Sequence, residues 1–183
     1  MELARELIVM DPWNRFTAGL IAAMAFARGM DFLSTWIVTP RLALEANPLM
    51  RRLRWGRMAL VNVPLLALPL FHHGLSITLV VTSLLVAGTN LSGGALARGM
   101  GERRQLESQL AALRRIGLPG ALMMNSAGSL VVCLGGAFMV ALVPVAESPP
   151  WWAALGVVLF GVAEFVHLNV AIVRLHRVGR RVG

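Results

Sequence analysis

The sequence predicts an all-α membrane protein, a polytopic bundle in which five helices cross a bilayer. Three observations predict this class. Of the 183 residues, 57% are hydrophobic and only 14% are charged, and the mean hydropathy is +0.70. Five apolar stretches alternate with short polar ones. The arginines gather in some polar stretches and are missing from others. A soluble domain does not need this much apolar surface, so residues 1–183 are expected to form a single transmembrane helical domain.

The first span is expected at residues 12–38. Asp11 suits the position that caps a helix N-terminus, Pro12 suits the first turn, and Trp13 suits the membrane interface. Pro40 follows the last apolar residue and ends the helix.

The second expected span, residues 57–71, is short and contains Pro64 and Pro69. Fifteen α-helical residues rise only ~22 Å, which is less than the ~30 Å thickness of the hydrocarbon core. This segment is therefore expected to be kinked or to lie in a thinned bilayer. A re-entrant hairpin remains an alternative.

Three further spans are expected at residues 75–97, 118–143 and 150–173. Between the third and fourth spans, residues 102–116 predict an amphipathic helix on the membrane surface. Leu106, Leu110 and Leu113 share one face of this helix, and charged residues take the other. The expected neighbour is anionic lipid, and a solvated connecting helix is the alternative.

All seventeen basic residues are arginine, and their distribution predicts the orientation. Five lie between residues 41 and 57, five between 98 and 115, and four between 174 and 181, whereas residues 72–74 and 144–149 carry none. Because loops that remain in the cytoplasm are rich in basic residues, five crossings place the N-terminus outside and the C-terminus inside. The arginines lie in short loops rather than in a soluble basic domain, so nucleic acid is not an expected partner.

The fourth span carries small residues at every fourth position, which favours close helix packing in lipid. The stripe consists of Ala121, Asn125, Ser129, Cys133, Ala137 and Ala141.

Polar residues inside the apolar spans are the candidate site, because an ionisable group in a bilayer normally faces a partner, a cavity or a ligand. A rise of about 1.5 Å per residue places them at one depth, near the cytoplasmic face. The candidate ligands in the spans are Asp31, Asn90, Asn125, Glu164 and His167.

Two helices contribute most of this chemistry. In the first span, Arg28, Asp31, Ser34 and Thr35 share one face, and Arg28 is expected to pair with Asp31. In the fifth span, the spacing of Glu164-x-x-His167 suits a divalent metal ion held from a bundle interior. The alternative is a His167 that hydrogen-bonds to a neighbouring helix, with Glu164 paired to Arg28 or protonated.

The loop after the first span adds Glu45 as a candidate ligand and Asn47 as a supporting residue. Asp31-x-x-Ser34-Thr35, followed by Glu45-x-Asn47-Pro48, resembles a small bacterial integral-membrane domain family of unknown function. The resemblance covers about residues 25–60. It implies a location in the bacterial cytoplasmic (inner) membrane, but it implies no activity.

Two functions fit these observations, and whether the chain is an enzyme stays open. The first is a cytoplasm-facing intramembrane site for a metal or another cation, hydrolytic if the metal activates water. The second is an accessory subunit of a larger membrane complex, in which the polar residues serve helix packing. A small transporter is a third possibility. The expected partners are the lipid bilayer and either other membrane subunits or a second copy of the chain.

Overall fold

A computed structural model describes residues 12–40, 42 and 48–182, and these residues form helices and no strands. The helices are α2 Pro12–Val38, α3 Pro48–Asn62, η1 Val63–Leu70, α4 His73–Met100, α5 Glu102–Leu142 and α6 Pro149–Val182. The all-α prediction is confirmed. Four of the helices, α2, α4, α5 and α6, are long and apolar enough to cross a membrane, as a multi-pass membrane protein requires.

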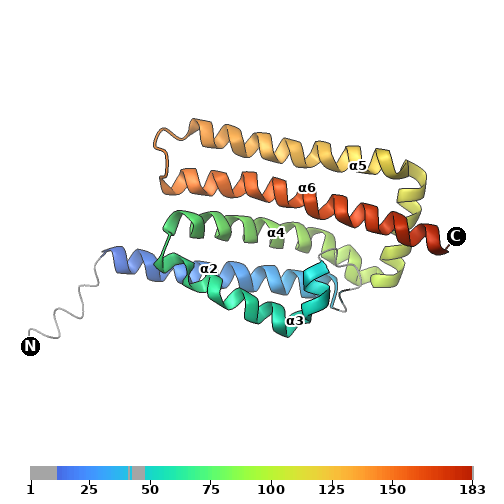
Figure 1. Cartoon of the computed structure of the whole chain (residues 1–183), viewed down its shortest axis with the longest axis horizontal. Helices are drawn as coiled ribbons and strands as arrows, with labels where there is room; N and C mark the ends of the chain where they lie inside the picture. Colours follow the sequence, from blue (N-terminus) through green and yellow to red (C-terminus); the bar gives the residue numbers. More distant parts are fainter. Residues whose placement is uncertain (1–11, 41, 43–47, 183) are drawn as a thin grey trace, which may run out of the picture.

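The long helices lie side by side in a row (Figure 1). α5 packs on α6, α6 packs on α4, and α4 packs on α2. The 3-10 helix η1 packs against both α2 and α4. The row therefore has α4 near its middle, and α2 and α5 lie far apart on either side of it.

The second expected span differs from a simple α-helix, and it is not among the four candidate spans. α3 has non-helical backbone angles at Arg54 (φ 58°, ψ −177°) and ends at Asn62. Residues Val63–Leu70 then form a 3-10 helix that contains Pro64 and Pro69. A 3-10 helix rises ~2.0 Å per residue instead of ~1.5 Å, so the change of helix type lengthens this short segment. In Figure 1, α3 and η1 lie along α2 and lead to the turn before α4.

The two ends of the row differ in charge. One end holds the start of α2, the turn before α4 and the turn between α5 and α6 (Figure 1). Residues 71–74 and 143–149 at this end contain no arginine. The other end, which we call the arginine-rich end, holds the start of α3, the turn between α4 and α5, and the end of α6. Its described arginines are Arg52, Arg54, Arg103, Arg104, Arg114, Arg115, Arg174, Arg177 and Arg180.

Helix α5 consists of two parts, because Gly117 has non-helical angles (φ 75°, ψ 160°). A positive φ is accessible to glycine without the steric cost that a Cβ would add. The break falls between the segments expected at 102–116 and 118–143. The first part runs across the arginine-rich end, and the second part runs along α6 (Figure 1).

The stripe of small residues on α5 packs on α6 over part of its length. Ser129 is buried, and the Cys133 thiol donates to the backbone oxygen of Val158 at 3.7 Å. Ala137 and Ala141 are exposed, so their expected role in packing is wrong. A spacing of four rotates about 40° per step around a helix of 3.6 residues per turn, and such a stripe leaves the contact face after a few steps.

Two glycines of α6 allow the close approach of its neighbours. A Cβ on Gly161 would lie 2.6 Å from Cys133 Sγ and 3.0 Å from the Cys133 backbone nitrogen on α5. A Cβ on Gly156 would lie 2.9 Å from the Thr78 backbone oxygen on α4. Backbone atoms cannot move aside as a flexible side chain can, so larger residues here would force the helices apart.

We therefore expect Gly161→Val to lower the stability of the protein in detergent by about 1–3 kcal/mol, the usual cost of overpacking. The matched control is Gly135→Val, because a Cβ at Gly135 meets nothing within 4 Å. Thermal unfolding followed by circular dichroism measures both variants. Equal unfolding temperatures for the two would contradict the close packing of α5 on α6.

Candidate functional site

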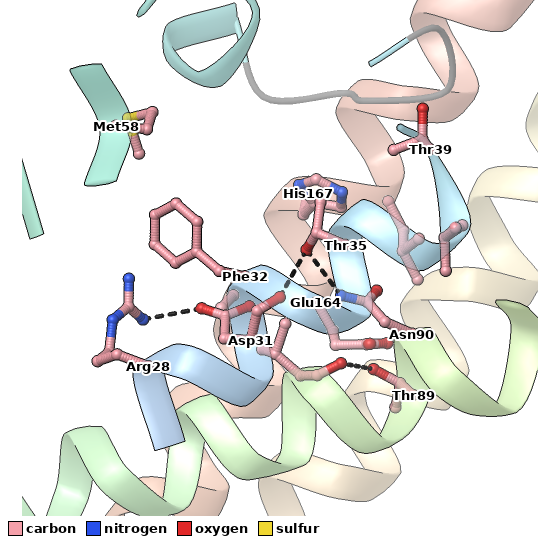
Figure 2. A pocket seen from close by; sticks show the side chains of 14 residues that line it. Arg28, Asp31, Phe32, Thr35, Thr39, Met58, Thr89, Asn90, Glu164 and His167 are labelled. Atoms are coloured by element: carbon pink, nitrogen blue, oxygen red, sulfur yellow. Dashed lines mark hydrogen bonds and ion pairs between the residues drawn. The ribbon is translucent and has the colours of Figure 1, made fainter. Parts of the chain in front are cut away.

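A groove opens between α2, α4 and α6, and part of α3 lies beside it. Its volume is about 350 Å³. Figure 2 shows the side chains that line it, which come from helices far apart in the sequence. The polar residues in its lining are Arg28, Asp31, Thr35, Thr39, Thr89, Asn90, Glu164 and His167. The structure therefore brings together most of the polar residues that the sequence singled out.

Arg28 joins three helices. Its guanidinium donates to Asp31 Oδ2 at 2.8 Å, which confirms the expected pair, and to Ser83 Oγ of α4 at 3.0 Å. It also donates to Asn62 Oδ1 at the end of α3. The side chains of Arg28 and Asp31 are each 19% exposed, so the two charges are largely removed from solvent and depend on each other.

The hydroxyls of Ser34 and Thr35 link α2 to α4. Each donates to the backbone oxygen of Asp31 at 2.9 Å, as hydroxyls three and four residues further along a helix can. Each also accepts a hydrogen bond from Asn90 Nδ2, at 3.3 Å for Ser34 and 3.2 Å for Thr35. The spacing of the motif Asp31-x-x-Ser34-Thr35 therefore has a structural reason. The backbone oxygen of Asp31 holds the two hydroxyls where they accept hydrogen bonds from the Asn90 amide of the neighbouring helix.

Glu164 and His167 form the opposite wall of the groove. They lie one helical turn apart on α6 and both line the groove. Glu164 is half-buried and His167 is exposed. Within residues 12–40, 42 and 48–182, neither side chain has a hydrogen bond or ion pair, and Arg28 is engaged by Asp31, Ser83 and Asn62 instead. The expected pairing of Glu164 with Arg28 is therefore not found.

Asn125 does not join this groove, contrary to the expectation from its depth. Its Nδ2 donates to Asn169 Oδ1 at 3.1 Å, between α5 and α6. Depth along a helix does not determine which neighbour a residue faces, and α5 packs on α6 at a distance from α2. Glu45 and Asn47 lie outside the described residues. Among the residues that the structure describes, no three His, Cys, Asp or Glu side chains come together as a metal site would require.

Three polar residues that the sequence analysis did not single out take part in these networks. Asn62 and Ser83 both receive hydrogen bonds from Arg28, and Asn169 pairs with Asn125. Asn62 and Asn169 lie in apolar stretches, as Asn90 does. If every asparagine inside an apolar stretch had been taken as a candidate, the sequence would have predicted both of them. Ser83 has no such signal, because serine is common in membrane helices at packing positions.

Compared with known proteins, the chain matches no protein-family model, no curated protein and no solved structure. The function is therefore argued from the geometry of the groove.

The Arg28–Asp31 pair yields a stability prediction. Arg28→Met removes the guanidinium that donates to the Asp31 carboxylate, so we expect a loss of roughly 1.5–3 kcal/mol, the range for hydrogen bonds to charged groups. In Arg28→Met/Asp31→Leu both charges of the pair are absent, and part of that loss should be recovered. Thermal unfolding in detergent compares the two. A double variant no more stable than Arg28→Met would argue against the pair as a stabilising unit.

Proposed function

We propose that this chain is a small multi-pass protein of a bacterial cytoplasmic membrane that binds a cation in the groove between α2, α4 and α6. One observation carries the proposal. Glu164 and His167 line the groove without a partner among the described residues, whereas Asp31 on the opposite wall is paired with Arg28 at 2.8 Å.

The balance of charge in the groove favours a cationic ligand. The guanidinium of Arg28 and the carboxylate of Asp31 offset each other, which leaves Glu164 as the uncompensated acid of the lining. A carboxylate at membrane depth is costly unless a positive charge or several donors surround it. A bound cation would remove that cost, and the imidazole of His167 would offer a nitrogen beside it.

Asn90 offers a further oxygen to the ligand. Its Nδ2 donates to the Ser34 and Thr35 hydroxyls, so its carbonyl oxygen remains as an acceptor in the lining of the groove. The expected donor set is therefore a carboxylate, an imidazole and an amide oxygen. This set suits a divalent metal that keeps several of its waters, as Mg²⁺ does with one or two carboxylates, and it also suits an organic ammonium ion.

Hydrolysis is the finer part of the proposal and depends on the kind of cation. A metal that retains water can lower the pKa of that water and generate a nucleophile, whereas an ammonium ion cannot. We therefore expect hydrolytic activity toward a membrane substrate only if a metal occupies the groove.

The alternative function is an accessory subunit of a larger membrane complex. Interhelical hydrogen bonds favour the accessory-subunit alternative, because Ser34, Asn90 and Asn125 all form hydrogen bonds between helices. Under this alternative, Glu164 and His167 would face a residue of a partner protein, and no cation would bind.

The orientation and the fifth crossing belong to the same proposal. The gathering of the arginines at one end supports a cytoplasmic arginine-rich end, with the start of α2 outside. The resemblance of residues 25–60 to the bacterial membrane family supports the location, and membership of that family is part of the proposal.

Cysteine labelling tests the orientation and the crossing by α3 and η1. In a Cys133→Ala background, we expect Phe71→Cys and Glu147→Cys to react with an impermeant thiol reagent on intact cells. Arg52→Cys and Arg115→Cys should react only after permeabilisation. All four positions are exposed in the structure. Labelling of Phe71→Cys and Arg52→Cys from the same side would show that residues 48–70 form a re-entrant segment.

Cation binding is expected to raise the unfolding temperature of the full chain in mild detergent. A cation at a hundred times its Kd stabilises by about 2.7 kcal/mol. Chlorides of Mg²⁺, Mn²⁺, Zn²⁺ and tetramethylammonium are compared at matched ionic strength, together with elemental analysis of the purified protein. Glu164→Gln and His167→Ala should abolish the stabilisation, whereas Glu147→Gln and His176→Ala should retain it.

Two results would contradict this proposal. No stabilisation by any of these cations, together with no bound metal, would favour the accessory subunit, and co-purification would then identify the partner. Equal stabilisation of the wild type and Glu164→Gln would place the cation elsewhere in the protein.

A further inference from the structure

A second cavity lies at the arginine-rich end, between the first part of α5 and the end of α6. We call it the elbow pocket, because it lies beside the break of α5 at Gly117. Its volume is about 550 Å³, within the ~300–1,000 Å³ usual for small-molecule sites. Aliphatic side chains form much of its wall, among them Leu106, Leu113, Ile116, Ile172, Leu175 and Val178.

The path of α5 explains why this pocket exists. The first part of α5 crosses α6 (Figure 1) and contacts it where a Cβ on Gly179 would lie 3.1 Å from Leu110 Cδ2. After the turn at Gly117, the second part of α5 packs along α6 at Ser129 and Cys133. Between these two contacts the helices leave a space that their own side chains do not fill.

In the described part of the chain, three polar residues line the pocket, namely Gln109, Asn125 and Arg174. Asn125 lines it, but its Nδ2 already donates to Asn169 Oδ1. Arg174 is the charged residue in the lining, and no acidic residue appears among the described residues that line it. Both helices also carry exposed arginines near this end, namely Arg104, Arg114, Arg115, Arg177 and Arg180, whereas the exposed Arg103 is paired with Glu107 at 3.1 Å. Around the elbow pocket an apolar wall thus meets a basic surface.

We propose that the elbow pocket binds an anionic phospholipid, with an acyl chain along the aliphatic wall and the phosphate near the arginines. A lipid of this class supplies both an apolar chain and a negative head group. Basic pockets between membrane helices are suited to such head groups. A second copy of the chain is a poorer occupant, because its own arginine-rich end would bring like charges together. This site is independent of the cation groove.

Native mass spectrometry of the full chain in mild detergent tests the proposal. The protein is mixed with phosphatidylglycerol or with phosphatidylcholine of the same acyl chains. We expect one phosphatidylglycerol to remain bound at concentrations at which phosphatidylcholine is lost.

Two variants test the two parts of the site separately. Ala112→Phe fills the pocket and should weaken phosphatidylglycerol binding, whereas its neighbour Ala111→Phe, outside the lining, should not. Arg114→Gln/Arg177→Gln should weaken phosphatidylglycerol binding by roughly tenfold or more and leave phosphatidylcholine unchanged.

Three results would overturn the proposal. The first is equal binding of both lipids, which would show that the arginines do not select the head group. The second is equal loss of lipid in Ala111→Phe and Ala112→Phe, which would show that the pocket does not hold the chain. The third is a dimer without bound lipid, which Ala112→Phe converts to a monomer, because it would identify a second copy as the occupant.

Discussion

The arrangement of α2, α3 and α4 depends on one constraint, which is that the guanidinium of Arg28 cannot face lipid without partners. A membrane offers no water to take their place, so the fold must bring polar atoms to the charge. Asp31 supplies one from the same helix, Ser83 supplies another from α4, and Asn62 supplies a third from the end of α3. Asn62 is also the last residue of α3 before η1, so the contact with Arg28 fixes where the short segment passes beside α2.

The same constraint makes the two walls of the groove different. On α2, each of the side chains discussed above forms a hydrogen bond, because Arg28 donates to Asp31, and Asn90 donates to Ser34 and Thr35, although the buried Nε of Arg28 has no partner among the described residues. The Arg28–Asp31 ion pair leaves the α2 wall nearly neutral. On α6, Glu164 and His167 face the groove without such bonds among the described residues. A ligand would therefore meet hydrogen-bonded side chains on one side and side chains without such bonds on the other.

Local spacing made the helices and part of the site predictable from the sequence. Arg28 and Asp31 lie three residues apart on one helix, and no tertiary information is needed to pair them. The break at Gly117 and the leucine face before it also follow from local sequence. The choice of neighbours could not be predicted in this way. Asn90 and Asn125 were assigned to one depth, but depth carries no direction around the helix axis, and only packing places Asn90 against α2 and Asn125 against α6.

Helix α6 separates two cavities of opposite chemical character. Leu168 lines both, whereas Glu164 and His167 line the groove alone and Ile172 and Leu175 line the elbow pocket alone. Glu164 lines the groove without a partner among the described residues, whereas Arg174 lines the elbow pocket, so under the two proposals the cavities would hold ligands of opposite charge. A helix with an acid on one face and bases near its end would keep two such ligands apart along its length, because each would be attracted to one region and repelled by the other. Under these two proposals, the arginines that would orient the protein in the membrane would also decide which of its cavities can hold an anionic lipid.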